Sequence, residues 1–217
     1  MAEVIKKILK FGKRDNILKL YKEGEIFCNT LNYFKSTEKS DALFDKLEGA
    51  TSIEQFTTLT LYIGNKEIMF SKDVESSAPK LKRGFLSTFD DSLQGNLFCC
   101  TAITDDNDEI IWNDKTNQLR SHNDFLAFGD TVLMIHNPMH FISAMQSKMQ
   151  SLGFENNINI VEYYDSNYEN RDLGMFCKTK EYEYQQELRF FIKNDSANTI
   201  KFNIGSLEEY SDIYSMI

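Results

Sequence analysis

The chain has 217 residues, 41% of them hydrophobic and 13% aromatic, and a formal net charge of −9. This length and composition indicate one folded domain and exclude a disordered chain. The acidic balance argues against nucleic-acid binding over the whole surface. No apolar run approaches the ~20 residues of a membrane-spanning helix, and the first residues lack a signal-peptide pattern, so we expect a cytoplasmic protein that does not enter a membrane.

Short apolar runs and alternating patterns, bounded by turn residues, predict strands along most of the chain. In chain order the expected strands are residues 3–12, 25–30, 55–63, 66–71, 96–104, 128–135, 157–165, 182–191 and 198–207. The Gly-Asn pair at 64–65 predicts a tight turn that joins two of them as a hairpin. Residues 210–217 are either a last strand or a short helix.

Two helices are expected between these strands. Residues 14–24 have helical apolar spacing and end in Gly24, and residues 137–153 begin with Asn137 as N-cap and Pro138 at the first helical position. Residues 31–38 are a turn or a short helix, and residues 41–52 are a polar loop. The order of elements favours an α+β fold with mostly antiparallel sheets.

The four cysteines and the amino-terminal lysines have simple interpretations. The cysteines have no zinc-binding spacing, so we expect free, buried thiols and no metal. Residues 1–22 carry seven cationic side chains and two acidic ones. We favour a solvated face for this charge run, with an anion-binding edge as the alternative.

An acidic and a basic residue interrupt the apolar segment 182–191. In a strand, Leu188 and Phe190 would face one side, and Gln185, Glu187 and Arg189 the other. A buried carboxylate is costly unless it is paired or used, and Arg189 lies roughly 7 Å along the strand. Two interpretations of Glu187 therefore remain open: it forms a structural ion pair, or its carboxylate faces a cleft.

Gln185-x-Glu187 on a late strand resembles the (Gln/Glu)-x-Glu element of ADP-ribosyltransferases. The resemblance implies that Glu187 holds a ribose hydroxyl of NAD and stabilises the oxocarbenium-like state formed as nicotinamide leaves. It also implies that Gln185 bears on the acceptor, and Arg189 joins these two as a catalytic candidate. We therefore expect NAD as a substrate.

The segment 16–34 is similar to the opening of the same superfamily, which begins with a basic residue on the first strand. Lys7 and Lys10 are the candidates for that residue here, although arginine or histidine is usual. Asn29 and Tyr33 follow the second strand, and the resemblance implies that Tyr33 stacks on nicotinamide. Lys178 is a candidate to meet a phosphate or Glu187.

The middle element of the superfamily, often Ser-Thr-Ser on a strand, has two possible counterparts. Ser87 and Thr88 lie in residues 85–89, and Thr101 ends residues 98–101. The sequence does not decide between them.

Several motifs between Gly24 and Arg189 resemble a family of bacterial and phage proteins, some of which belong to abortive-infection or toxin systems. They include FDKLEG at 44–49, FGD at 128–130 and VEYYD at 161–165. Asp45 and Glu48 in the first motif can bind a cation or a partner, cap a helix, or lie in a solvated loop.

Together the resemblances imply a single ADP-ribosyltransferase-like domain over residues 1–217, with two small, mostly antiparallel sheets and a few helices. The expected function is an NAD-dependent defence or toxin enzyme that modifies a macromolecular acceptor. The alternative is a non-catalytic binding protein of phage–host conflict that blocks a protein partner. An antitoxin is one candidate partner.

Overall fold

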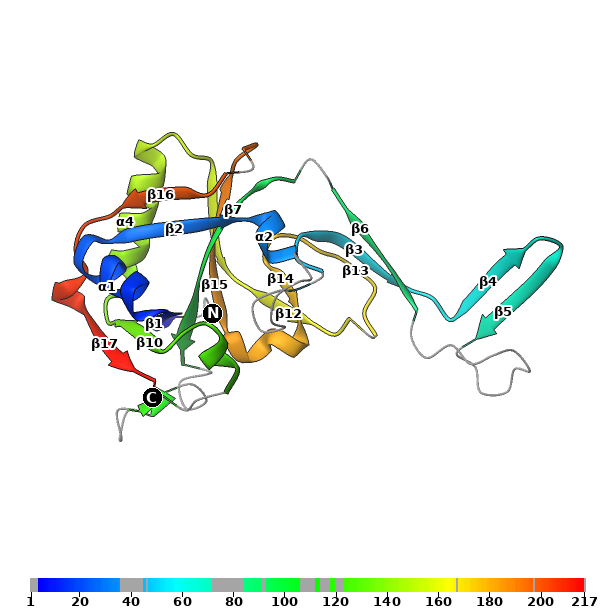
Figure 1. The fold of residues 1–217 in the computed structure, drawn as a ribbon, viewed down its shortest axis with the longest axis horizontal. Coiled ribbons are helices and arrows are strands. Elements are labelled where there is room, and N and C mark those ends of the chain that lie inside the picture. The colour runs from blue at the N-terminus through cyan, green and yellow to red at the C-terminus, as the bar shows by residue number, and fades with distance from the viewer. Residues whose placement is uncertain are drawn as a thin grey trace.

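A computed structural model describes most of the chain (Figure 1). The described residues are 4–35, 45, 47–71, 84–90, 93–105, 112–113, 118–119, 123–166, 168–196 and 198–216. Strands in mainly antiparallel sheets dominate, with a few helices beside them, so the expected α+β class is confirmed.

The largest sheet has eight strands, which differs from the expected pair of small sheets. Six strands follow the order β11 (Asn156–Ile160), β15 (Glu187–Lys193), β7 (Gly95–Thr104), β1 (Ile5–Gly12), β10 (Thr131–Ile135) and β17 (Ser211–Ser215). Strand β2 (Glu25–Thr30) pairs with β7, and β16 (Ile200–Asn203) pairs with β2. Strand β7 is therefore the centre of the sheet.

Smaller sheets flank this one. They are β13 (Arg171–Asp172) with β3 (Ala50–Gln55) and β6 (Phe85–Phe89), the hairpin β4 (Thr58–Ile63) with β5 (Lys66–Ser71), the parallel pair β12 (Glu162–Tyr164) with β14 (Cys177–Thr179), and β8 (Trp112–Asn113) with β9 (Gln118–Leu119). The β4–β5 hairpin projects from the body of the molecule (Figure 1). The side chains of Leu61, Tyr62 and Ile63 on it are exposed.

The helices are α1 (Arg14–Glu23), α2 (Leu31–Lys35) and α4 (Pro138–Ser151), and the 3-10 helices are η1 (Asn123–Ala127), η2 (Lys180–Gln185) and η3 (Glu208–Tyr210). Both expected helices are confirmed. The N-cap of helix α4 is Asn137, whose side chain accepts a hydrogen bond from the His140 N–H. The Asp130 carboxylate accepts from the Arg14 N–H, which satisfies one of the free donors at the start of α1.

Several element boundaries differ from those expected. Residues 50–52, expected in a loop, begin strand β3, and Gln55, expected to begin the next strand, ends it, because this segment pairs with β6. Residues 41–44 and 46 lie outside the described residues. The expected strand 157–165 is two strands that pair in different sheets. Residues 211–215, expected as a strand or a short helix, are strand β17, because they pair with β10 at the edge of the sheet.

The start of the segment 182–191 is helical and not extended. Helix η2 ends at Gln185, and Gln186 has a left-handed backbone with φ 42°, after which β15 begins at Glu187. The Gln186 carbonyl accepts from the Ala102 N–H of β7 at 2.8 Å, which fixes this turn against the sheet. Gln185 and Glu187 are thus two residues apart without sharing a strand.

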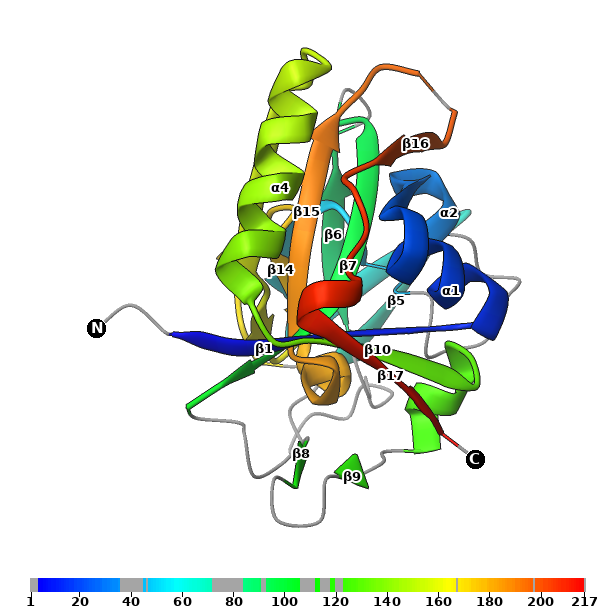
Figure 2. The same ribbon diagram turned by 90° about the vertical axis from the view of Figure 1, so that its left-hand side faces the viewer.

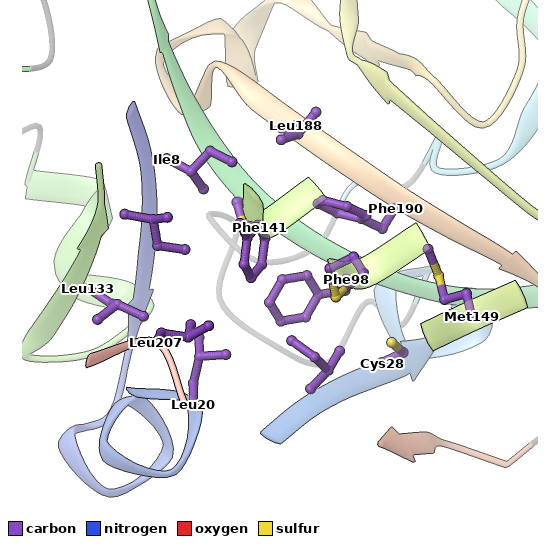
Figure 3. Packing of buried hydrophobic residues seen from close by; sticks show 14 of the residues in the cluster. Ile8, Leu20, Cys28, Phe98, Leu133, Phe141, Met149, Leu188, Phe190 and Leu207 are labelled. Carbon is purple, nitrogen blue, oxygen red and sulfur yellow. The ribbon is translucent and has the colours of Figure 1, made fainter. Parts of the chain in front are cut away.

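The main core covers one face of the eight-stranded sheet. Figure 2 shows α4 running beside β15, and Figure 3 shows Phe141 and Met149 of α4 packed near Phe190 and Phe98. Leu188, Phe190 and Ile192 all belong to this cluster. The predicted division of β15 into an apolar face and a face with Glu187 and Arg189 is therefore confirmed.

The sheet splits beside β7. Strand β1 pairs with β7 only as far as Leu9 opposite Thr101, and β2 begins to pair with β7 at Asn29 opposite Leu97. Between these points, Phe98–Cys100 of β7 pair with β15 on one side. No strand pairing is described for them on the other side, within the part of the chain that the structure describes. The split leaves room for a cavity.

The end of α1 packs closely against the backbone of Gly205 at Gly24. Gly24 has a left-handed φ of 62°, and a Cβ there would overlap the backbone of Gly205. Gly153 also has a left-handed φ, 76°, but a Cβ would meet nothing within 4 Å. We expect Gly153→Ala to cost about 1 kcal/mol of unfolding free energy from backbone strain alone, and Gly24→Ala to cost clearly more. Equal losses in urea unfolding would contradict the close approach.

Candidate functional site

A cavity of about 740 Å³ lies at the split between β1, β7 and β2. Its size falls within the range of small-molecule sites. Strands β1, β2, β7, β14, β15 and β16, helices α1 and α2, and the 3-10 helices η1 and η2 all contribute side chains to the wall. Segments that are distant in sequence therefore meet at this point.

The cavity wall is cationic although the protein is acidic. Six cationic side chains line it, namely Lys10, Lys13, Lys19, Lys178, Arg189 and Lys201, against Glu25, Glu48 and Glu187. The excess of three positive charges contrasts with a net charge of −9 for the chain. Aromatic side chains complete the wall: Phe11, Phe27, Tyr33, Phe34, Phe98, Phe125 and Phe128. Such a wall suits an anionic ligand with ring systems.

Arg189 is the centre of a buried charge network at the floor of the cavity. Its side chain is 1% exposed. The guanidinium binds Glu48 with two nitrogens, at 2.6 and 3.1 Å, and its Nε donates to Glu187 Oε1 at 2.7 Å. It also donates to the carbonyl of Met175. The planar fork of arginine explains why one residue can hold two carboxylates in fixed positions.

Glu187 is held by two cations. Its second oxygen accepts from Lys178 Nζ at 3.2 Å, and its backbone N–H donates to the Tyr163 hydroxyl at 2.8 Å. Burial raises the pKa of Glu187, but the charges of Arg189 and Lys178 outweigh that effect and hold the pKa well below its usual range. Glu187 is therefore an ionised carboxylate at neutral pH. A carboxylate has about four acceptor positions, so it can still accept hydrogen bonds from a ligand.

The acidic loop motif enters the same network. Glu48 is 2% exposed, and burial raises its pKa while Arg189 lowers it in part. Asp45 is also buried, and its side chain accepts from the Leu47 N–H at 2.9 Å. Of the alternatives that the sequence left open for Glu48, the structure places it in a buried ion pair with Arg189 and not in a solvated loop.

Gln185 lies next to Glu187 despite the turn between them. Its side-chain oxygen accepts from Lys178 Nζ at 2.8 Å, and its amide nitrogen donates to the Tyr184 hydroxyl at 3.2 Å. The hydroxyl of Thr101 donates to the Gln185 carbonyl at 2.8 Å. Lys178 thus joins Gln185 to Glu187, which agrees with the expectation that it meets Glu187.

The other candidates for ligand contact fall into two groups. Lys10, Asn29 and Tyr33 line the cavity, and Lys10 Nζ donates to the Cys99 carbonyl at 2.6 Å across the split. Ser87 and Thr88 lie on β6, outside the lining, where Thr88 is hydrogen-bonded to β3. Of the two Ser/Thr elements that the sequence left open, the one with Thr101 lines the cavity.

Sequence reasoning missed some residues of the wall. Phe27 and Lys201 face each other across β2 and β16, with Lys201 Nζ 5.3 Å from the Phe27 ring. Phe27 sits between two buried residues, Ile26 and Cys28, so its alternation with them could have indicated an outward-facing position. No signal in the sequence points to Lys201, because its role depends on a pairing between distant strands.

Among the described residues, no group of three or more histidine, cysteine, aspartate or glutamate side chains could hold a metal ion. No helix in the same part of the chain has the length and apolar character needed to span a bilayer.

Removal of Arg189 should destabilise the protein more than removal of Arg171, whose side chain is 26% exposed. Arg189→Met leaves Glu48 and Glu187 without their main cation, and we expect a loss of about 3–5 kcal/mol of unfolding free energy. Arg171 pairs with the exposed Glu162 at 2.9 Å, so Arg171→Met should cost less than about 1 kcal/mol. Urea unfolding of both variants gives the comparison. Similar losses would mean that the buried network contributes little.

The low pKa of Glu187 predicts how stability changes with pH. The carboxyl loses its proton more readily in the folded protein than in the unfolded chain, where the pKa is about 4.3. Its stabilising contribution is therefore complete above that pH and is lost as pH falls toward the folded-state value. The stability difference between wild type and Glu187→Gln should shrink between pH 6 and pH 3. For the exposed Glu155, Glu155→Gln should have a small effect throughout. A constant difference for Glu187→Gln would contradict the assignment.

No protein-family model matches the chain, and no curated protein or solved structure is significantly similar to it. The function is therefore inferred from the charges, contacts and shape of the cavity. These features are a buried ionised carboxylate, an excess of cations and a wall rich in aromatic rings.

Proposed function

We propose that the protein is an NAD-dependent ADP-ribosyltransferase-like enzyme of a defence or toxin system. The observation that carries the proposal is an ionised carboxylate, Glu187, on the floor of a cationic and aromatic cavity. NAD combines a diphosphate, two ribose rings and two flat bases, which such a wall can bind. The resemblance of Gln185-x-Glu187 to the superfamily element supports the same reading.

The proposed step is a substitution at the ribose carbon that carries nicotinamide. The carbon–nitrogen bond breaks and its electron pair leaves with nicotinamide, so positive charge develops on the ribose. A nucleophile of the acceptor then forms the new bond to that carbon and loses its proton. Glu187 would accept a hydrogen bond from a ribose hydroxyl and stabilise the developing charge, which is electrostatic catalysis by a preorganised group.

The surrounding residues have defined parts in this proposal. Arg189 holds the Glu187 carboxylate in one orientation, and Lys178 fixes its other oxygen next to Gln185. Tyr33 and Phe34 lie edge to face at 5.4 Å in the wall. In this proposal the ring of Tyr33 would contact nicotinamide. Because the Gln185 amide is already bonded at both ends, it would orient an acceptor only by exchanging one of these bonds.

The same network also favours a second candidate, a binding protein without catalysis. Glu48, Glu187, Lys178 and Arg189 have no net charge together and pair with one another. Such a network is what a structural role for Glu187 requires. In this case the cavity binds a ligand or a partner that the protein sequesters, and no bond is broken.

NAD turnover by two buried-carboxylate variants separates the candidates. Thermal melting alone does not separate the two candidates, because Glu187→Gln and Glu48→Gln both remove an anion that Arg189 binds. If Glu187 acts on the ribosyl cation, Glu187→Gln should lower kcat by about 10²–10³, the scale for loss of one electrostatic contact to a transition state. Glu48→Gln should reduce turnover much less at a temperature where both variants are folded.

The measurement is release of nicotinamide from NAD, with and without a cell lysate as the source of acceptor. Label transfer from NAD to a lysate component would identify the acceptor class. Equal losses in the two variants would assign Glu187 a structural role. Wild-type protein that releases no nicotinamide under either condition would rule out the transferase and leave the binding protein, to be tested by capture of a stable complex.

A further inference from the structure

The charged side chains of the cavity wall form two groups. At the floor, Glu48, Glu187, Lys178 and Arg189 neutralise one another through contacts of 2.6 to 3.2 Å. The whole excess of three positive charges therefore belongs to the remaining charged residues of the wall, which are Lys10, Lys13, Lys19, Lys201 and Glu25.

Two of these lysines are on one face of α1. Lys13 precedes the helix as its N-cap, Asn16 follows three residues later and Lys19 three residues after that, and all three line the cavity. Residues three apart lie on the same side of a helix, and the stripe is roughly 9 Å long at 1.5 Å per residue. Lys13 and Lys19 are exposed, and no ion pair is described for either one within the described part of the chain.

An exposed aromatic ring lines the same cavity. Phe27 is 42% exposed although it lines the cavity, and Lys201 is beside it. The carboxylate of Glu25 pairs with Lys201 at 3.8 Å, so the excess of three positive charges comes from Lys10, Lys13 and Lys19. A wall that carries both an exposed aromatic ring and unpaired ammonium groups matches a base and its phosphates.

We infer that the part of the cavity wall formed by Lys13, Asn16, Lys19, Phe27 and Lys201, outside the Glu187 network, is a binding site for a nucleoside diphosphate group. Lys13 and Lys19 bind the diphosphate, and Phe27 contacts the base. The inference rests on the proposed function for the identity of the part of the ligand that reaches Glu187. A diphosphate ester would then enter with its anionic part at α1 and its other end at Glu187, because the floor has no spare positive charge to attract the phosphates.

Calorimetric titration of the full chain with ADP, adenosine and inorganic pyrophosphate tests this site without any need for catalysis. ADP should bind about tenfold or more tightly than adenosine, and its affinity should fall as salt is raised. Lys13→Ala combined with Lys19→Ala should weaken ADP binding by about tenfold and leave adenosine binding unchanged. The control is Lys22→Ala, on the same helix but outside the cavity wall, which should have no effect.

Phe27→Ala separates base contact from phosphate contact, and should weaken ADP and adenosine binding equally while leaving pyrophosphate binding unchanged. Equal affinities for ADP and adenosine, or the same ADP affinity in the double lysine variant and in Lys22→Ala, would overturn the site.

The transferase is judged separately. Lysine-dependent ADP binding without nicotinamide release would support the proposed diphosphate site and contradict the transferase. Nicotinamide release with an unchanged KM for NAD in the double lysine variant would support the transferase and contradict the diphosphate site.

Discussion

The structure depends on one buried guanidinium. Arg189 projects from β15, binds both oxygens of Glu48 just before β3, and donates to Met175 just before β14. It therefore joins the eight-stranded sheet to the beginnings of two smaller ones. Because a charge with 1% exposure must be fully bonded, these segments can take few positions relative to one another. The orientation of Glu187 follows from the same contacts.

The sequence was sufficient for the local features of the site and not for the long-range ones. Alternation along β15 predicted which face carries Glu187 and Arg189, and their spacing left a contact between the two side chains possible, which the structure shows. The partner of Arg189 that lies 141 residues earlier, Glu48, could not be found this way, because nothing local marks a buried pair across such a distance. The left-handed Gln186 was missed for a different reason, since glycine usually occupies that conformation.

The distribution of charge has a kinetic consequence. An acidic surface repels anions in general, while a cavity wall with an excess of three positive charges attracts them locally. Low-dielectric walls concentrate such a field, so the association rate of an anionic ligand should depend on ionic strength more than its dissociation rate does.

The projecting β4–β5 hairpin differs from the rest of the fold in how it is supported. Among the strands that the structure describes, its two strands pair only with each other, and Leu61, Tyr62 and Ile63 near its tip are exposed. Two strands without a packed face have little stability of their own. The hairpin should therefore open locally long before the molecule unfolds, and its amide protons should exchange with solvent sooner than those of β7. A protease that nicks the folded chain would find its first sites there.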